Sequence, residues 1–272
     1  MITAAISRLS ARRALPLALA ITLASAPALA VDPPPARLVP GLPGGGGTDV
    51  AVIAVSLTFT ALGTFVIHPS STANVAPLDG LGHRDRDVTV GLATDLIVGI
   101  GGLGAIGVSL WGELDQGSRG WRSLRAPLIL TEAAVVSIGI DSLIKNLGGV
   151  CRPRAWNDAT ATCDSTDPED RRSFPSGHTV PLAALSGASL GMWLLPSGPR
   201  DPWAAGLFVA TTALAFSNVG LRVAAGAHSW VDTTAAFGLG FSLGITTAAL
   251  HVRRAPVTVA VSGSGLSLSG SW

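Results

Sequence analysis

Six apolar segments dominate the pattern of hydrophobic and polar positions along the chain. They lie at roughly 48–67, 89–111, 126–147, 179–195, 203–220 and 230–250. A helix needs about 20 predominantly apolar residues to cross a bilayer, so each segment is near that length and the fourth is marginal. Alanine, glycine, serine and threonine are frequent in them, which favours close helix–helix packing. The pattern predicts an all-α membrane bundle of about six helices in one domain, residues 48–252.

The two ends of the chain differ from this core. Residues 1–30 have the pattern of a signal peptide, because arginines precede an apolar stretch and Ala28 and Ala30 fit the small residues of a cleavage site. An uncleaved anchor helix is the alternative. Residues 31–47 are rich in proline and glycine and predict a flexible linker. Residues 253–272 alternate around a Gly-Ser break, which predicts a short C-terminal β-hairpin.

The composition supports a membrane location. The chain is 48% hydrophobic and 13% charged, with a mean hydropathy of +0.49, whereas soluble domains average about 25% charged residues. The net charge of +1 gives no indication of a nucleic-acid partner. Cys151 and Cys163 share one polar loop, so they either form a local disulfide, if that loop lies outside the cytosol, or remain free thiols.

Three acids lie inside apolar segments, where a carboxylate should face the bundle interior and find a partner. Asp141 precedes Lys145 by four residues, so the two share a helical face and can pair. Asp95 and Glu132 are interpreted as structural acids.

Chemically active residues gather after the third and the fifth apolar segments. In a bundle of six helices these two loops open on the same side, so their residues can meet. The set comprises Lys145, Arg152, Ser176, Gly177, His178, Arg222, His228 and Asp232. Each alone has an ordinary explanation, such as an interfacial anchor for an arginine or a helix cap for Ser176. Together they predict a site for an anion with several oxygens, and phosphate is the obvious candidate.

Five of these residues are suited to binding phosphate. Arg152 and Arg222 offer forked N–H donors to phosphate oxygens, and Lys145 adds a point charge. The Ser176 hydroxyl and the Gly177 N–H would complete the cradle where a helix begins.

The other three residues are suited to the chemistry. His228 is placed to attack phosphorus, and Asp232, four residues later, would hold the other ring N–H. His178 would protonate the leaving oxygen. The expected intermediate is a phosphohistidine that water hydrolyses, with cations doing the electrostatic work that a metal does elsewhere.

These residues fall into three motifs that identify a family. They are K-x6-R-P from Lys145 to Pro153, P-S-G-H from Pro175 to His178, and R-x5-H-x3-D from Arg222 to Asp232. In this order they resemble the signature motifs of the type 2 phosphatidic acid phosphatase superfamily, over about residues 48–252. That superfamily includes lipid phosphatases, undecaprenyl pyrophosphate phosphatases, bacterial acid phosphatases and vanadium haloperoxidases. The resemblance implies the same binding and catalytic roles for the eight residues. One departure is Leu221, where the third motif often begins Ser-Arg, and it removes one possible hydroxyl contact.

The orientation in the membrane depends on two expectations that conflict. Lipid phosphatases of this superfamily usually face away from the cytosol, whereas a leader that exports residue 31 followed by six crossings would put the motif loops in the cytosol. If 48–67 does not cross, the motifs face the periplasm and the arginines of the opposite loops face inside, as the positive-inside rule requires. Those arginines are Arg119, Arg122, Arg125, Arg200, Arg253 and Arg254. We therefore expect a bacterial inner-membrane protein with a periplasmic site, and 48–67 packed on the bundle or lying at the interface.

The predicted function is hydrolysis of a phosphate monoester or diphosphate by a metal-independent phosphatase. A phosphorylated membrane lipid is the favoured substrate because the site adjoins apolar helices. The alternatives are a broad-range periplasmic acid phosphatase acting on small phosphate esters, a vanadate-dependent haloperoxidase and an inactive membrane scaffold. No cofactor is expected, since no cluster of metal ligands and no nucleotide-type glycine loop is apparent along the chain.

Overall fold

The computed structural model describes residues 37–38, 46–65, 74–80, 82–195, 201–253, 258–262 and 265–269. The predicted signal peptide at 1–30 and most of the linker at 31–47 lie outside these residues.

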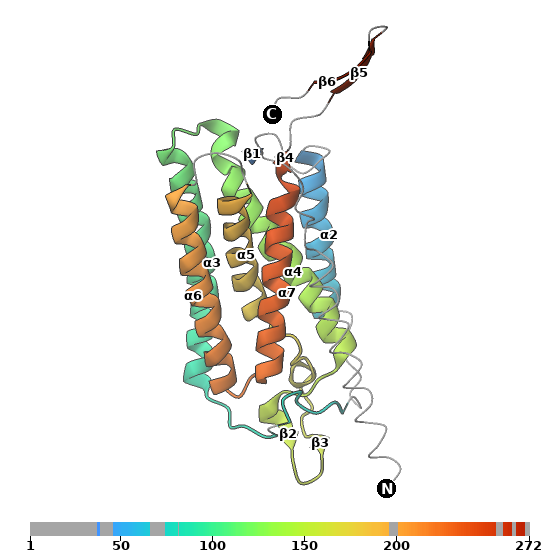
Figure 1. Cartoon of the computed structure of the whole chain (residues 1–272). Coiled ribbons are helices and arrows are strands. Elements are labelled where there is room, and N and C mark those ends of the chain that lie inside the picture. Colours follow the sequence, from blue (N-terminus) through green and yellow to red (C-terminus); the bar gives the residue numbers. More distant parts are fainter. Residues whose placement is uncertain are drawn as a thin grey trace.

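Six long helices account for most of the described chain (Figure 1). They are α2 (Gly46–Phe65), α3 (Val88–Asp115), α4 (Arg125–Gly148), α5 (Thr179–Leu194), α6 (Pro202–Ala224) and α7 (Trp230–Leu250). Each predicted apolar segment corresponds to one of them, so the all-α prediction is confirmed. Helices α3, α6 and α7, and α4 together with the turn before it, are long and apolar enough to cross a membrane, whereas the apolar parts of α2 and α5 are shorter.

Local sequence signals set several helix ends. The Asp87 side chain accepts a hydrogen bond from the N–H of Val90 and caps the start of α3. Gly149 ends α4 in the left-handed conformation, which glycine adopts without strain. Pro202 occupies the first turn of α6. Ser229 and Asp232 form a capping box at the start of α7. Gly149 and the capping box lie in motif regions, so the same segments shape the helices and the site.

Helix α5 lies at the centre of the bundle, packed against α4, α6 and α7. Nearly all its residues from Thr179 to Met192 are buried. The contact with α7 depends on glycine, because a Cβ built on Gly187 would lie 2.0 Å from the Phe241 carbonyl oxygen and one on Gly244 equally close to that of Ala184. Small residues at such contacts let membrane helices approach closely.

One face of α3 is apolar and exposed along several turns. Leu92, Leu96, Ile100 and Leu103 are 54–75% exposed. A continuous apolar surface of this kind is unfavourable in water and suits contact with lipid. The composition of the bundle and the exposure of this face therefore both favour a location in the membrane.

The bundle has two chemically different ends. The starts of α3, α5 and α7 and the ends of α4 and α6 lie together at what we name the site end (Figure 1). The opposite end is named the far end. Helix α2 begins at the far end and packs along α4, which agrees with the expectation that 48–67 packs on the bundle.

Short strands and turns complete the two ends. At the site end, the strands β2 (Trp156–Asn157) and β3 (Thr162–Cys163) pair antiparallel. The turns η2 (Pro153–Ala155) and η3 (Pro168–Arg171) belong to the same loop, and Cys151 and Cys163 form a disulfide across it. At the far end, β1 (Arg37–Leu38) pairs with β4 (Val252–Arg253). The expected C-terminal hairpin is present as β5 (Thr258–Ser262) and β6 (Gly265–Ser269).

Candidate active site

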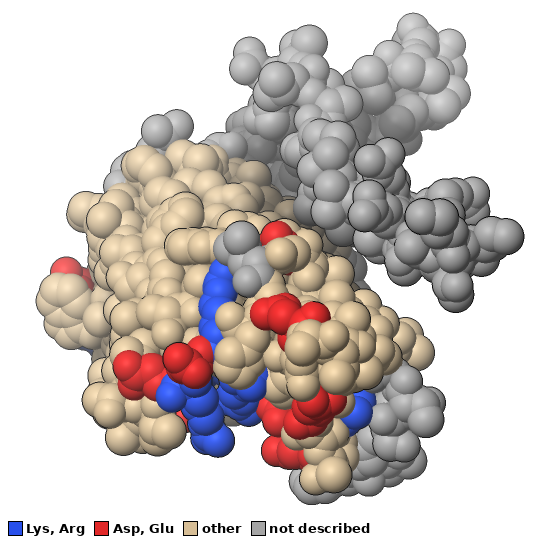
Figure 2. All heavy atoms as spheres, turned by 90° about the horizontal axis from the view of Figure 1, so that it is seen from below, with Lys and Arg blue, Asp and Glu red and all other residues tan. Residues whose placement is uncertain are grey.

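A cavity of about 450 Å³ opens at the site end. Arg152, His178 and Arg222 line it, and all three were predicted for the site from the sequence. Val88 and Leu92 of α3 provide an apolar part of the wall. Charged side chains of both signs gather on this end of the molecule, where Figure 2 views it directly. The cavity therefore joins a charged interior to the apolar face of α3.

The other predicted residues do not line this cavity but surround the three that do. They are Lys145, Ser176, Gly177, His228 and Asp232.

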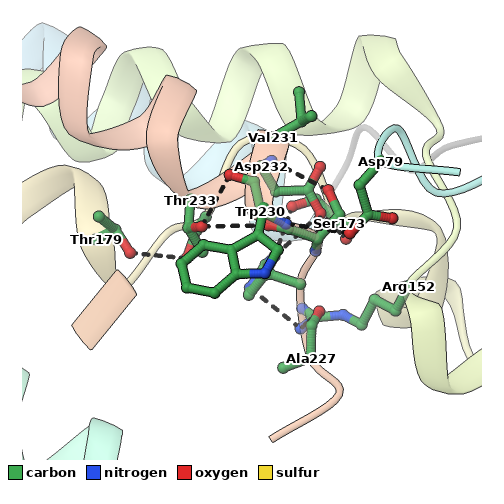
Figure 3. Close-up of polar contacts among 12 residues, drawn as sticks. Asp79, Arg152, Ser173, Thr179, Ala227, Trp230, Val231, Asp232 and Thr233 are labelled. Carbon is green, nitrogen blue, oxygen red and sulfur yellow. Dashed lines mark hydrogen bonds and ion pairs between the residues drawn. The ribbon is translucent and has the colours of Figure 1, made fainter. Parts of the chain in front are cut away.

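Arg152 is held in place by the loop that follows α4. Its backbone N–H donates to the Asp170 carbonyl at 2.7 Å, and its Nε donates to the Glu169 carbonyl at 2.8 Å. One guanidinium nitrogen then lies 3.4 Å from the Ala227 carbonyl oxygen and 3.5 Å from His228 Nε2. Figure 3 shows this side chain reaching toward Ala227. Arg152 is thus fixed between the cavity and the imidazole of His228.

The buried imidazole of His228 has a defined tautomer. Its Nδ1 lies 2.7 Å from the backbone carbonyl oxygen of Ser173. A carbonyl can only accept a hydrogen bond, so Nδ1 carries the proton and Nε2 carries the lone pair. The lone pair faces the Arg152 side of the site. Nε2 is therefore the atom able to act as a nucleophile.

Asp232 lies next to His228 but is not the direct partner of its ring. The Asp232 carboxylate is 3.8 Å from His228 Nδ1, a longer separation than the hydrogen bond to Ser173. One carboxylate oxygen accepts from the Ser173 hydroxyl at 2.6 Å and from the Ser229 N–H at 2.8 Å, and Figure 3 shows Ser173 and Asp232 side by side. Ser173 therefore contacts both residues, through its carbonyl and its hydroxyl.

His178 directly precedes α5 and is paired with an acid from α3. Its Nε2 lies 2.7 Å from an Asp95 carboxylate oxygen. The side chain is 35% exposed, so it faces the cavity and can reach a ligand there. The same Asp95 oxygen is 3.8 Å from Arg222, which places one carboxylate between a cation and the candidate proton donor.

Arg222 enters the cavity from the end of α6. One of its guanidinium nitrogens donates to the Thr94 hydroxyl of α3 at 3.0 Å. Its Nε has no hydrogen-bond partner among the described residues, although the residue is only 6% exposed. Buried polar groups are nearly always hydrogen-bonded, so this N–H is available to an oxygen of a bound anion.

Lys145 and the P-S-G-H motif meet behind the cavity. The Lys145 ammonium pairs with Asp141 at 3.1 Å, as the spacing predicted. A Cβ built on Gly177 would lie 2.5 Å from Lys145 Nζ, so a larger residue would displace the ammonium from this position. Ser176 is fully buried, and its hydroxyl accepts from Thr179 at 3.2 Å. The three motifs thus converge on one end of the bundle.

The family comparison matches the region that contains all three motifs. A model of the PAP2 superfamily matches residues 126–256. Residues 126–256 belong to the PAP2 superfamily. No curated protein and no solved structure matches the chain. Membership supports phosphatase-type activity on phosphate esters.

Burial and nearby cations lower the pKa of both histidines of the PAP2 motifs, His178 and His228. Burial is the main cause that lowers the pKa of His228 well below its usual value, and Arg152, Arg222, Lys145 and His178 lower it further. The imidazole is therefore neutral at neutral pH, with Nε2 unprotonated beside Arg152. Burial and Arg222 likewise lower the pKa of His178 to about 4, and Asp95 opposes this shift. An anion in the cavity would oppose it as well and favour the protonated, acidic form of His178.

Sequence reasoning missed three residues of the candidate site. Asp95 was interpreted as structural, yet it contacts His178 and lines the cavity. Ser173 positions His228 and Asp232, and its place three residues before Ser176 was the available signal. Glu169 lines the cavity and pairs with Arg172 and, at 3.7 Å, with Arg152. Its carboxylate rests against a guanidinium that a phosphate would use.

Cations and carboxylates both line the cavity, and the carboxylates are Asp87, Asp95, Asp167 and Glu169. Within the described residues, the group of three ligand-type side chains that could share one ion lies at the far end, on α2, α4 and after α7. Around the cavity, the positive charge comes from arginine and lysine side chains.

Proposed function

We propose that this protein is a metal-independent phosphatase that forms a phosphohistidine on His228 and acts on a phosphorylated membrane lipid. The observation that carries the proposal is the geometry of His228. Its Nδ1 is bound to a carbonyl while its Nε2 points at Arg152, an arginine of the cavity wall. Nucleophile and anion-binding group are thus adjacent and held by the backbone.

The first half of the reaction transfers the phosphoryl group to the protein. The Nε2 lone pair attacks phosphorus while the bond from phosphorus to the ester oxygen breaks. His178 gives its proton to that leaving oxygen, so the alcohol departs neutral. Arg152, Arg222 and Lys145 stabilise the phosphoryl oxygens. The positive charge that develops on His228 is compensated by Asp232, 3.8 Å from its Nδ1.

The second half releases inorganic phosphate. Water attacks phosphorus as His178 accepts its proton, the P–N bond breaks, and the electron pair returns to Nε2 of His228. The products are the free alcohol and phosphate, and both histidines regain their starting protonation.

The apolar cavity wall favours a lipid over a small ester. Val88 and Leu92 line the cavity and are 64% and 59% exposed, and the apolar face of α3 continues through Leu96. An acyl or prenyl chain can lie along this face while its phosphate reaches Arg152. A small water-soluble ester would leave these side chains without a function in binding.

We further propose that the site end faces the periplasm. The Cys151–Cys163 disulfide lies at this end and requires an oxidising compartment. Arg119, Arg122 and Arg125 precede or begin α4 at the far end, where the positive-inside rule would keep them in the cytosol. In this orientation β1 and the start of α2 lie on the cytosolic side, which conflicts with a leader that exports residue 31. Impermeant thiol labelling of Asp85→Cys but not Gln116→Cys in intact spheroplasts is expected, and the reverse pattern would contradict it.

Phosphate release by detergent-purified protein tests the activity. The substrates are phosphatidate, phosphatidylglycerophosphate, undecaprenyl diphosphate and an aryl phosphate, each measured in EDTA. We expect release from at least one lipid, faster than from the aryl phosphate, and loss of release in His228→Ala. His83→Ala, an exposed histidine at the same end, is the matched control. Faster turnover of the aryl ester would instead favour a broad-range phosphatase, and activity of His228→Ala would overturn the mechanism.

A further inference from the structure

Three ionisable side chains from three helical regions meet in the interior near the far end. Asp49 comes from the first turn of α2, Glu132 from α4, and His251 directly follows α7. Their exposures are 4%, 1% and 0%. One ligand atom from each lies within 4.8 Å of the other two. These residues belong to none of the motifs and contact none of the residues of the candidate active site described above.

The cluster contains polar atoms that the protein leaves unsatisfied. His251 Nδ1 lies 2.9 Å from the Thr247 carbonyl oxygen, so Nδ1 carries a proton and Nε2 faces the cluster. Nε2 is 3.1 Å from a Glu132 carboxylate oxygen. Even so, neither His251 Nε2 nor either Glu132 oxygen has a hydrogen-bond partner within the described chain. Buried acceptors that face one another are costly unless a cation or a shared proton lies between them.

We propose that Asp49, Glu132 and His251 bind a divalent first-row transition-metal ion, best represented by Zn²⁺. With an ion bound, the imidazole ligand is neutral and the two carboxylates carry two negative charges, which a divalent ion neutralises. Carboxylate oxygen and imidazole nitrogen are both ligands of zinc, at about 2.0–2.2 Å. A histidine ligand whose second nitrogen donates to a backbone carbonyl is the arrangement by which proteins orient metal-binding imidazoles, and the Thr247 contact supplies it.

The distances suit a site that closes when an ion binds. Bonds of about 2.0–2.2 Å in a tetrahedral arrangement separate neighbouring ligand atoms by about 3.3 Å. The Glu132–His251 separation of 3.1 Å is already close to this value. The widest separation, at most 4.8 Å, requires a modest side-chain rotation. A water molecule would occupy the fourth position.

The role of this ion would be structural. Glu132 precedes Lys145 by 13 residues on one helix, which corresponds to about 20 Å at 1.5 Å per residue. An ion there is too far away to touch a substrate in the cavity. Among the described elements, α2 packs extensively only on α4. An ion bound by Asp49 and His251 would connect α2 to the end of α7 as well.

Metal content of the full-length, tag-free protein in detergent tests the site. The protein is stripped with EDTA, dialysed against Zn²⁺ or Co²⁺, and measured by plasma mass spectrometry and by the visible absorption of Co²⁺. The variants are Glu132→Gln and Asp49→Asn. Glu113→Gln is the matched control, because Glu113 is also buried at the far end but pairs with Arg125 at 2.8 Å. Gel filtration and phosphate release establish that each variant is folded.

We expect about one ion per chain in wild type and in Glu113→Gln, with the Co²⁺ bands of a four-coordinate O/N site. Glu132→Gln and Asp49→Asn should lose the ion. Zn²⁺ should raise the thermal midpoint of wild type and leave that of these two variants unchanged. Folded wild type that binds no ion would overturn the proposal in favour of a proton shared between Glu132 and His251. Equal binding by wild type and Glu132→Gln would overturn it by placing the ion elsewhere.

Discussion

The two ends of the bundle each bury a histidine with carboxylates, but they differ in what surrounds it. At the site end, His228 lies beside Arg152, and Asp232 accepts hydrogen bonds from Ser173 and Ser229. At the far end, Glu132 faces His251 without a hydrogen bond. The first arrangement places a guanidinium beside the imidazole while the carboxylate is occupied by other donors, and it suits an anion. The second groups two carboxylates with one imidazole and suits a cation. The same residue types therefore predict opposite ligands once their neighbours are included.

Separate substitutions of His228 and His251 test this difference, and they have the largest expected effect. His228→Ala should lower kcat by at least about 10⁴-fold, because it removes the nucleophile itself. His251→Gln should change kcat by less than about threefold, since His251 lies at the other end of α7. Phosphate release under saturating lipid measures both. A large loss in His251→Gln with intact folding would show that the two ends are coupled.

Substitution of one arginine at each end compares a role in phosphate binding with a role in a structural ion pair. Arg152→Lys should lower kcat/KM by about 10²-fold, because a lysine cannot replace the fork of donors on a phosphoryl group. Arg125→Lys, at the far end, retains a cation beside Glu113 and should lower activity by less than about twofold. Equal effects of the two substitutions would argue against a specific role for the Arg152 guanidinium.

The contact between Asp232 and His228 can be separated from the role of Asp232 as a helix cap. Asp232→Asn should lower kcat by about 10²-fold, less than in a serine-protease triad, because Ser173 already holds the His228 ring. Ser173→Ala keeps that backbone carbonyl and loses only the hydroxyl bound to Asp232, so about a tenfold loss is expected. Stability is measured in parallel. A fall in stability with unchanged kcat in Asp232→Asn would assign Asp232 to capping alone.

The smallest predicted effect is a shift in pH dependence. Asp95 raises the pKa of His178 against the influences of burial and Arg222, so Asp95→Asn should lower that pKa below about 4. The protonated form of His178 is needed to protonate the leaving group, and activity falls as pH rises through its pKa. The basic limb of kcat/KM against pH should therefore move to lower pH in Asp95→Asn and stay in place in Glu113→Gln. An unmoved limb would remove Asp95 from the proton-transfer step.

The sequence alone predicted the helices well, because apolar runs are encoded locally. Three short motifs supplied the eight candidate site residues, and helix packing brings these motifs to one end of the bundle. The partner of His228 was harder to predict. The spacing to Asp232 suggested a shared helical face, but α7 begins at Trp230, so His228 precedes the helix and its ring turns to the Ser173 carbonyl instead.

Contacts between helices that are distant in the sequence could not be predicted from local patterns. Hydropathy indicates that Asp95 interrupts an apolar segment, but not which way α3 is rotated, and that rotation brings Asp95 to His178. Asp49, Glu132 and His251 are likewise far apart in the sequence, and only helix packing brings them together. A metal-ligand pattern could not be recognised without the fold.

The central claim is that His228 carries the phosphoryl group, and rapid-quench trapping with ³²P-labelled substrate tests it most directly. The account predicts protein-bound label that forms within one turnover, resists base, is lost in acid and maps to the peptide containing His228. His178→Ala should retain the label longer, because water then attacks without a base. Normal turnover with no bound label at any time, or label on another residue, would contradict the account.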